Sequence, residues 1–530
     1  MNIIGYHITD KIASNNSNST VVTNNENISD FLFLDFGECI KVFYHLDYSV
    51  ACILKALNLS LECLKELAET GDLSFDNLEI QYIAGVWFAI KNTETKQWAG
   101  FSDTAQYSNH SLAMNQNKTT CLSYAQIAKK TGEAVYSSLV KLGLSPKSLT
   151  SPVSAYNKEI LSHISLPTID DIPKDAAWAA YQCCHGGWVE AYKQGHFLEA
   201  WDYDIKSAYG SELAKLIDTR FCKWIEDTNF REDAIYGYCL CEVTILKNFS
   251  PIIVNGFTPI GTFCTYMTKA EMEFIDNHDI GVWKIIEGYW CVPSISEESL
   301  KNMQDVKPLK SLIKDLYRLK EETADSIHSN NIKRILAGIW GKTLEVTTRL
   351  GDNFNPCWGA EVESRIRLKV AEAVIRNNAQ EHLLSITVDG VLTDQPFNLL
   401  LDNGTMGSWK LSSHCPVVII GSGIQAVKDK PSKAQFALNY NWLLNEIKIL
   451  PRANTYKIHG TSPMTLLKAN IHKKFKDLGK VQPYNRLIEI DNDIKRCYTT
   501  KISNGRELLK KHSDTVPWDY SLVAEKRTEE

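Results

Sequence analysis

The order of apolar and polar residues predicts a mixture of strands and helices in the N-terminal part of the chain. Residues 31–44 and 80–90 are almost continuously apolar, as in buried strands, whereas residues 48–70 and 122–143 repeat apolar positions at the helical period. Residues 13–28 form a polar Asn/Ser tract, for which we expect a loop or a disordered arm.

Residues 144–159, rich in Pro and Ser, predict a boundary, after which strands and helices follow in an α+β order. Residues 200–216 predict a strand that runs into a helix. Residues 385–394 (SITVDGVLTD) predict a hairpin around an Asp-Gly pair. Between them we expect strands at 236–246 and 282–292, a mixed segment at 260–278, and helices at 306–322 and 326–342.

Length and composition exclude several classes of protein. A chain of 530 residues predicts three or four packed units rather than one core, whereas the other features exclude classes of protein. No apolar run approaches the roughly 18 residues of a membrane-spanning helix, and the N-terminus lacks the basic and apolar regions of a signal peptide. The 14 cysteines show no paired CxxC spacing, which argues against a zinc ribbon or a disulfide scaffold. We therefore expect a cytoplasmic protein.

The net charge of −6 is unevenly distributed along the chain. Residues 1–200 hold 14 Lys and Arg against 21 Asp and Glu, residues 201–400 hold 22 against 29, and residues 401–530 hold 21 against 13. The C-terminal excess of positive charge fits a polyanion contact, because phosphate binding depends on local charge. A solvated, lysine-rich domain explains the same excess equally well.

Two aspartates lie where predicted strands end. Asp204 lies between a strand and a helix, where a carboxylate can bind a divalent ion or can cap the helix. Asp389 lies in the predicted hairpin turn, which Asp-Gly favours for conformational reasons alone. However, a charged Asp at the tip of an apolar hairpin needs a partner or an ion. Together the two carboxylates could hold two hard cations for nucleotidyl transfer.

A third segment, KRILAGIWGK, begins at Lys333. On a helix, Lys333, Ala337 and Trp340 share a face, and this face could receive a triphosphate and a sugar or base. Ordinary amphipathic packing with an extended lysine is the alternative.

The order of the three segments resembles the family B DNA polymerases, and specifically their protein-primed branch from phages and linear plasmids. DIKSAYGS from Asp204 resembles motif A (DxxSLYPS), KRILAGIWG from Lys333 resembles motif B (KxxxNSxYG), and SITVDG resembles motif C (YxDTDS) with Asp389 as its second Asp. The segment 179–204, which contains Gly186-Gly187, is similar to the YxGG link of that branch, as is Lys342 after motif B.

The resemblance implies a right-hand polymerase preceded by an RNase H-like exonuclease-type domain. It implies that an N-terminal polar arm covers residues 1–30 and that residues 151–199 form a linker. The other implied domains are an exonuclease-like domain at 31–150, a palm at 200–300 and 350–425, fingers at 301–349, and a thumb at 430–530.

The resemblance also implies the roles of individual residues. Two Mg²⁺ ions, with Mn²⁺ as the alternative, would bind Asp204, the Ile205 backbone and Asp389, and Lys333 would act in catalysis beside them. The implied nucleotide-binding residues are Ile205, Lys206, Ser207, Ala208, Tyr209, Arg318, Ala337, Trp340 and Gly341, with the Tyr209 ring under the deoxyribose. The implied DNA-binding residues are Gly186, Gly187, Lys342, Lys495 and Arg496.

Several positions depart from the family pattern. Thr387 replaces the first Asp of motif C, Gly210 replaces the proline of motif A, and Ala337, Gly338 and Trp340 replace the Asn, Ser and Tyr of motif B. The motif B changes affect the pocket for the base pair and the sugar. Only 56 residues separate Lys333 from Asp389, which leaves little room for a strand-displacement insertion.

The exonuclease motifs are degenerate. The Asp-x-Glu of the first motif corresponds to Asp35-x-x-Glu38, Asp103 falls near the second motif, and Thr131-Gly132 occupies the place of the third motif's Asp. A two-metal nuclease needs its carboxylate cluster intact. We therefore expect the domain to be retained without 3′–5′ proofreading.

Three functions fit the sequence. The first is a monomeric, Mg²⁺-dependent DNA polymerase that uses a primer-template and dNTPs, with a terminal protein as a candidate primer, for replication of a phage or plasmid in a bacterial cytoplasm. The second is a nucleotidyl transferase that works without a template or accepts ribonucleotides. The third is a catalytically silent DNA-binding protein with a polymerase fold, whose DNA binding would depend steeply on salt.

Overall fold

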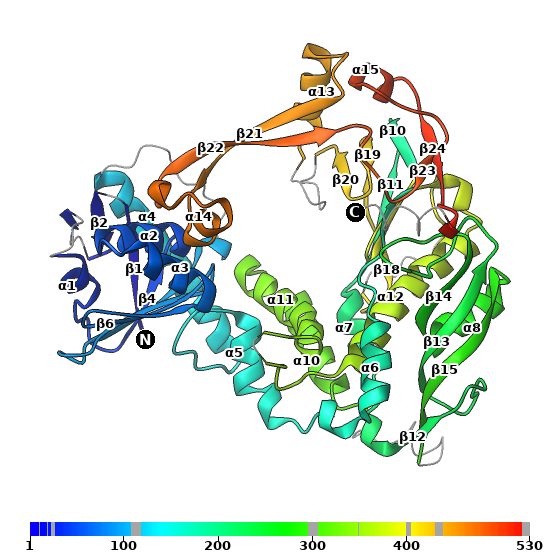
Figure 1. Cartoon of the computed structure of the whole chain (residues 1–530), viewed down its shortest axis with the longest axis horizontal. Helices are drawn as coiled ribbons and strands as arrows, with labels where there is room; N and C mark the ends of the chain where they lie inside the picture. The colour runs from blue at the N-terminus through cyan, green and yellow to red at the C-terminus, as the bar shows by residue number, and fades with distance from the viewer. Residues whose placement is uncertain are drawn as a thin grey trace. The chain divides into compact units, whose positions relative to one another are not determined.

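The structure is a computed structural model that describes residues 1–9, 11–17, 20–22, 27–107, 118–294, 306–347, 349–398, 404–429 and 438–521 (Figure 1). The chain forms two compact units. The first unit comprises Met1–His163, Leu319–Ile335 and Ile458–Arg486, and the second comprises Ile164–Arg318, Leu336–Lys457 and Leu487–Glu530.

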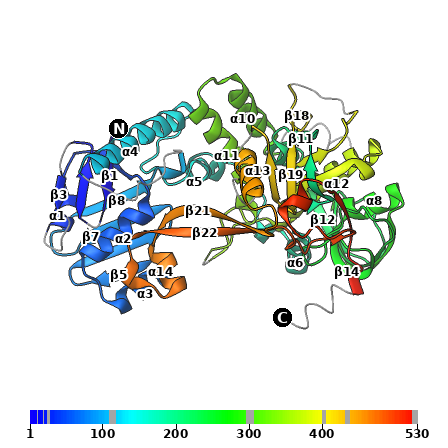
Figure 2. The same cartoon turned by 90° about the horizontal axis from the view of Figure 1, so that it is seen from above.

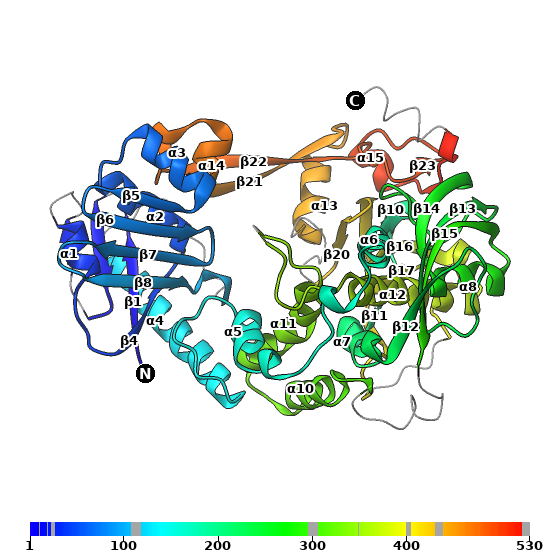
Figure 3. The same cartoon turned by 60° about the horizontal axis from the view of Figure 1, so that its bottom comes forward.

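The first unit contains an eight-stranded mixed sheet with the order β3-β2-β1-β4-β8-β7-β6-β5, and its strands β5 to β8 lie side by side in Figure 3. Strands β1, β4 and β8 are parallel, and the other neighbouring strands are antiparallel. The strands are β1 (Asn2–Ile8), β2 (Ile12–Asn15), β3 (Thr20–Val22), β4 (Cys39–Phe43), β5 (Asp72–Phe75), β6 (Leu78–Ile83), β7 (Trp87–Asn92) and β8 (Trp98–Asp103).

Helices cover this sheet unequally. Helices α2 (Leu46–Ala56) and α3 (Leu61–Thr70) bury their apolar residues in one core with the sheet, and α4 (Lys118–Lys141) packs on β1 and β2 (Figure 2). Helix α14 (Leu466–His472), from the C-terminal part of the chain, packs against α2 and α3. The unit also contains α1 (Ile28–Leu32) and α5 (Pro152–Glu159).

Three expectations for this unit are wrong. Residues 31–44 do not form one buried strand, because Phe31 and Leu32 end helix α1 and β4 begins only at Cys39. The polar tract at 13–28 is not a free arm, because β2 and β3 lie in it and β1 is an inner strand of the sheet. Its asparagine side chains supply hydrogen-bond partners for the backbone: the Asn16 Oδ1 accepts the Gly5 N–H at 2.6 Å, and the Oδ1 of the buried Asn15 accepts the Ser17 N–H at 3.0 Å. Residues 80–90 form parts of two strands, since a turn after Ile83 separates β6 from β7.

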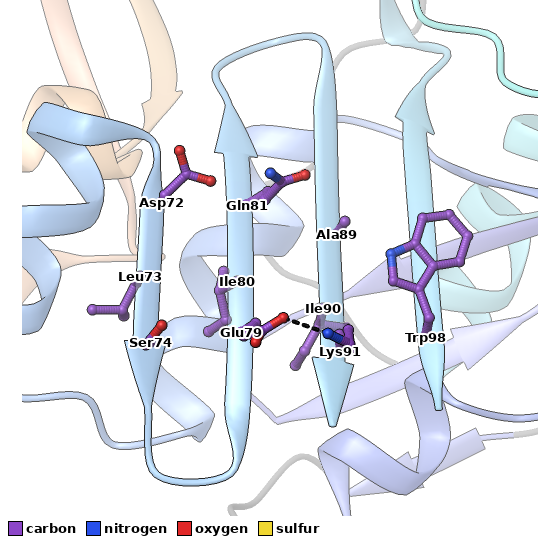
Figure 4. Close-up of a pocket in the computed structure, with 10 residues that line it drawn as sticks. All are labelled: Asp72, Leu73, Ser74, Glu79, Ile80, Gln81, Ala89, Ile90, Lys91 and Trp98. Carbon is purple, nitrogen blue, oxygen red and sulfur yellow. Dashed lines mark hydrogen bonds and ion pairs between the residues drawn. The ribbon is translucent and has the colours of Figure 1, made fainter. Parts of the chain in front are cut away.

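One outer face of β5–β8 carries a shallow hollow of about 360 Å³, shown in Figure 4. Its side chains alternate with the buried Leu73, Ile80 and Ile90 of the same strands, as the two-residue period of a strand requires. A Glu79–Lys91 ion pair of 2.7 Å crosses from β6 to β7. The sequence-predicted site residues lie elsewhere.

The second unit contains three antiparallel sheets. The sheet that bears the predicted site has the order β18-β11-β17-β16-β9, and the others have the orders β20-β19-β10-β24-β23 and β12-β15-β13-β14. The site-bearing strands are β9 (Val189–Ala191), β11 (Trp201–Ile205), β16 (Leu383–Thr387), β17 (Gly390–Thr393) and β18 (Trp409–His414). The remaining strands are β10 (Lys193–Phe197), β12 (Cys222–Glu226), β13 (Tyr236–Ile245), β14 (Gly261–Thr268), β15 (Gly281–Pro293), β19 (Val417–Gly421), β20 (Ile424–Val427), β23 (Cys497–Tyr498) and β24 (Ser513–Val516).

A long buried helix, α12 (Pro356–Arg376), packs against α6 (Lys174–Gln182), α7 (Ala208–Leu213) and α8 (Lys269–His278). It begins at Asn355, whose side chain accepts the Trp358 N–H at 3.1 Å. The unit also contains α13 (Tyr440–Ile449), α15 (Gly505–Leu508) and the first part of α10 (Lys310–Glu322), which crosses into the first unit after Arg318.

The predicted fingers and thumb do not coincide with the compact units. Residues 319–335 of the predicted fingers and 458–486 of the predicted thumb belong to the first unit. The chain passes between the units in α11 (Ser326–Thr343) and in the two-stranded pair β21 (Thr455–Pro463) and β22 (Val481–Glu489). Residues 295–305 and 430–437, which the domain prediction included, lie outside the described residues.

The other sequence predictions for the second unit are confirmed. A strand followed by a helix occupies 200–216, and the hairpin at 385–394 is β16–β17. The pair of helices expected after residue 306 is α10 and α11. Among the residues that the structure describes, no helix has both the length and the apolar character needed to cross a membrane.

Candidate active site

The two predicted catalytic aspartates lie near each other in the backbone: Asp204 is on β11, and Asp389 is in the turn that leads into the neighbouring strand β17. In the pair β11–β17, Asp204 is opposite Gly390, the residue that follows Asp389. The Ile205 N–H donates to the Asp389 carbonyl oxygen at 3.0 Å, which ties the end of β11 to the turn. Gly390 has no room for a side chain, since a Cβ there would lie 3.1 Å from the Tyr203 carbonyl oxygen. This close approach brings the ends of motifs A and C together.

The turn that carries Asp389 is strained. Thr387 pairs with Gly390, so Val388 and Asp389 form a two-residue turn. Val388 has φ of +58°, whereas Asp389 does not have a positive φ. The turn is therefore not of the type I′ expected from Asp-Gly, which needs a positive φ at both positions. A β-branched residue in this region costs on the order of 1–3 kcal/mol and often marks a functional site.

Asp204 does not cap the helix that follows it. The N-cap residue of α7 is Ser207, in the left-handed region at φ 49° and without a side-chain cap bond. Instead, the Lys410 Nζ on β18 lies 3.0 Å from the Asp204 Oδ2. Sequence reasoning missed Lys410, because its partner is 206 residues away and only the strand register pairs the two.

Tyr209 and Trp340 form an aromatic pair in the same unit. Their ring centroids are 4.8 Å apart at an interplanar angle of 44°. Burial raises the pKa of the Tyr209 hydroxyl to about 12, and the nearby negative charge of Asp389 adds to this shift. Tyr209 thus lies within electrostatic range of Asp389, and its sugar-binding role stays a prediction.

The predicted DNA-binding residues differ in their surroundings. Gly187 lies against Val388, since a Cβ on this glycine would be 2.8 Å from the Val388 Cγ2. Lys342 pairs with Glu345, and the Lys495 Nζ donates to the Gly256 carbonyl oxygen.

Arg496 is not an exposed DNA contact. Its side chain is 2% exposed, pairs with Glu190 at 3.2 Å and lies 4.1 Å from the centre of the Tyr192 ring. The prediction failed because a basic residue in a basic segment was assigned to the surface, whereas its charge is neutralised in the core of the unit.

No protein-family model matches the sequence, and no curated protein sequence matches it. Solved structures do match. Phi29 DNA polymerase with primer-template DNA and incoming nucleotides aligns with a TM-score of 0.62 at 12% identity over 92% of this chain and 99% of that chain. Its complex with single-stranded DNA aligns with a TM-score of 0.57 at 13% identity, over 80% and 86% of the two chains.

The chain has a phi29 DNA polymerase-like fold. The likeness extends over 92% of the chain. At 12% identity it establishes the fold, and the roles of the site residues are taken up below as proposals.

Within this phi29-like fold, the other predicted nucleotide-binding residues occupy varied positions. Lys333 and Ala337 are exposed on α11, and a Cβ on Gly341 would meet open space. The Arg318 side chain is 65% exposed and lies 3.4 Å from Asp315. Lys333 belongs to the first unit and Asp204 to the second, so their joint action stays a prediction.

The backbone at motif A is partly committed to protein contacts. The Lys206 N–H donates to the Ser408 carbonyl oxygen at 2.9 Å, and the Lys206 carbonyl oxygen accepts the Gly407 N–H at 2.7 Å. The Lys206 backbone is therefore bonded within the protein, whereas the cradle predicted for the triphosphate, the backbone from Ser207 to Tyr209, stays a prediction.

The donor set at the predicted metal site is small. Among the described residues, no group of three or more His, Cys, Asp and Glu side chains is arranged to hold a metal ion. Asp204, Asp389 and the Ile205 carbonyl supply oxygen donors only. This set fits Mg²⁺, which binds few protein carboxylates and keeps positions for water and substrate phosphates.

The predicted exonuclease residues lie in separate environments of the first unit. Asp35 and Glu38 are exposed in the segment between α1 and β4, where the Asp35 Oδ1 accepts the Gly37 N–H at 2.8 Å. Asp103, at the end of β8, is buried and accepts the Ala105 N–H at 2.9 Å. In α4, a Cβ on Gly132, next to Thr131, would be 2.9 Å from Ile3.

Proposed function

We propose that this chain is a Mg²⁺-dependent, DNA-directed DNA polymerase of the protein-primed branch of family B. It would add dNMPs to a primer by two-metal nucleotidyl transfer. The observation that carries the proposal is the meeting of the Asp204 strand with the turn that holds Asp389, within a phi29-like fold. Two carboxylates at one sheet edge are what nucleotidyl transfer with hard cations requires.

Asp204, Asp389 and the Ile205 carbonyl would hold the metal ions. Bound Mg²⁺ supplies charge stabilisation for the transferring phosphoryl group and a lower pKa for the primer hydroxyl, and Mn²⁺ shares its preference for oxygen donors. The paired strands hold both carboxylates at fixed positions. The Lys410 ammonium balances the charge of Asp204 while no nucleotide is bound.

The nucleotide would be bound by groups from motifs A and B. The Lys333 and Arg318 side chains are exposed cations that would contact the β- and γ-phosphates, and the backbone from Ser207 to Tyr209 would receive the remaining oxygens. The Tyr209 ring, packed on Trp340, would support the deoxyribose and exclude a 2′-hydroxyl.

Proofreading is proposed to be absent, because Asp35 and Glu38 lie in an exposed turn and Asp103 already binds backbone amides. The proposed substrates are a DNA primer-template and dNTPs, and a terminal protein is a candidate primer. The phi29 polymerase structures that share this fold contain such DNA and nucleotides. We place the activity in the replication of a phage or plasmid in a bacterial cytoplasm, with the chain acting as a monomer.

Primer extension tests the proposal. With a primer-template, dNTPs and Mg²⁺, templated incorporation is expected from the unaltered chain and not from Asp204→Ala or Asp389→Ala. Activity retained in either variant would refute the metal assignment.

A second candidate is a transferase with relaxed substrate choice, which the altered motif B favours: Trp340 contacts Tyr209, and Ala337 is exposed next to it. Incorporation without template, or of ribonucleotides at rates similar to dNTPs, would select this candidate. Binding of DNA without incorporation under any metal would leave a silent DNA-binding protein.

A further inference from the structure

Two side chains of α12 bind the backbone of Gly186, one at its N–H and the other at its carbonyl oxygen. The Gly186 N–H donates to the Glu363 Oε2 at 2.8 Å, and the Arg367 Nη1 donates to the Gly186 carbonyl oxygen at 2.8 Å. The Glu363 and Arg367 side chains are 6% and 1% exposed. With φ of +79°, Gly186 adopts a conformation that this grip helps to maintain.

The held segment leads directly to the turn that carries Asp389. The Trp188 carbonyl oxygen accepts the Val388 N–H at 2.7 Å, and Val189 pairs with Thr387 in the sheet. Gly187, between Gly186 and Trp188, packs on the Val388 side chain. Both the backbone and the side chain of Val388 therefore rest on residues 187–189.

Val388 needs this support because its backbone is strained. A valine at φ +58° would relax toward a negative φ if its neighbours allowed it, and such strain persists only where the surroundings fix it. Relaxation at Val388 would change the direction of the next residue, Asp389. The position of the carboxylate thus depends on how firmly residues 186–189 are held.

Arg367 and Glu363 belong to a buried charge network. The Arg367 Nη2 lies 2.7 Å from the Glu271 Oε1, and both side chains are 1% exposed. Glu271 in turn accepts the Thr268 N–H at 2.9 Å, which fixes it at the start of α8. Burial raises the pKa of the Glu363 carboxyl, and the Arg367 charge and the Gly186 N–H oppose that shift. Removing one member of such a network leaves another buried polar group without its partner.

We propose that Glu363, supported by Arg367, is a positioning residue for Asp389, which it holds in place through Gly186, Trp188 and the strained Val388. This inference rests on the proposed function only for the role of Asp389. The hydrogen bonds of Glu363 and Arg367 to Gly186, called the clamp below, are present in the free protein. Glu363 acts through other residues and needs no contact with nucleotide or DNA.

Hydrogen exchange of the free protein, without metal or DNA, tests the clamp. In Glu363→Ala, the backbone amides of residues 383–393 are expected to exchange about tenfold faster or more, since the loss of the buried hydrogen bond frees the turn. Glu363→Gln, whose side-chain oxygen still accepts the Gly186 N–H, should exchange nearly as the unaltered chain does.

The matched control is Glu361→Ala. Glu361 is a buried acid on the same helix, but it pairs with Arg365 at 2.8 Å. This variant should lose stability without faster exchange in 383–393. Equal exchange of that segment in the Glu363→Ala and Glu361→Ala variants would overturn the proposal. If Glu363→Ala does not fold, Glu363→Asp takes its place, because it keeps the charge beside Arg367 and withdraws the oxygen from Gly186.

Steady-state kinetics of dNMP incorporation provide a second test of the same proposal. Glu363→Ala should lower kcat for dNMP incorporation by about 10- to 100-fold and change the KM for dNTP by less than about threefold, since binding groups are untouched. Adding Val388→Gly, which removes the strain, should restore at least part of kcat. No recovery would overturn the link through Val388. A chain that incorporates nothing refutes the proposed function, and its exchange data still decide the clamp.

Discussion

Acidic residues lie at sheet edges in both units, but in different chemical situations. In the second unit, Asp204 and Asp389 are 185 residues apart in sequence, and paired strands bring them together. In the first unit, Asp103 is turned to backbone amides, and Asp35 and Glu38 lie on an exposed segment. An acid can bind a ligand when strand register aligns it with a second acid. An acid whose oxygens already accept amide hydrogens has a structural role.

The proposed difference between the acids of the two units is tested most strongly by substituting acids in each unit in turn. Asp204→Asn or Asp389→Asn should reduce primer extension by at least about 10³-fold, because each removes a metal-binding carboxylate. Asp35→Asn should leave the rate within about twofold. Steady-state primer extension measures both, and a comparable loss in the Asp35 variant would show that the two units share the chemistry.

A smaller effect is expected at the aromatic pair. Tyr209→Val removes the ring that packs on Trp340 and opens the space under the sugar. The ratio of ribonucleotide to deoxyribonucleotide incorporation should rise by about 10²-fold, measured as the ratio of kcat/KM values. The control is Tyr107→Val, which removes a tyrosine of the first unit and should not change that ratio.

The sequence allowed the site to be predicted where the signal is local. Asp204 lies at the end of a strand that runs into a helix, Asp389 lies between two apolar segments, and the order of the motifs predicts that the two meet. Lys410 could not be found in this way, because only the folded register brings it to Asp204. The strain at Val388 was also hidden, since Asp-Gly favours a different turn.

Secondary structure could likewise be predicted where the apolar pattern is local. The prediction failed where buried polar residues depend on partners far away in the sequence. Apolar periodicity predicted the helices α4 and α11, but Ser14 and Asn15 lie in a strand that is polar and buried, where hydrogen bonds replace apolar contacts. Arginine is usually a surface residue, and nothing near Arg496 in the sequence reveals its buried partner, Glu190, which lies 306 positions away.

Asp103 provides a stability test for the first unit. Burial raises the pKa of its carboxyl to about 6, although hydrogen bonds from the Ala105, Leu46 and His45 amides lower it. The folded state then binds a proton more tightly than the unfolded state between about pH 4 and 6, so stability falls as the pH rises through this window.

Asp103→Asn should therefore flatten the dependence of stability on pH between 4 and 6. It should also increase the free energy of unfolding at pH 7 by about 1–2 kcal/mol, part of the roughly 3 kcal/mol that a two-unit shift represents. Urea unfolding at several pH values measures this. A loss of stability at pH 7 would mean that the ionised carboxylate is needed by its amide donors.

The smallest effect is expected at Lys410. Its ammonium group competes with a metal ion for Asp204, and its side chain is 40% exposed, so the competition is weak. Lys410→Met should lower the Mg²⁺ concentration for half-maximal extension by about threefold. A higher requirement would instead indicate that Lys410 assists the nucleotide.

The packing of α14 on α2 and α3 has a practical consequence. Met464, Leu466, Ala469 and Leu478 complete the apolar interior of the N-terminal sheet, although more than 300 residues separate them from it. A fragment that ends near residue 163 would present this interior to water and would tend to aggregate. Truncation from the C-terminus would damage the opposite end of the polypeptide, and a premature stop codon upstream of residue 464 would leave neither half intact.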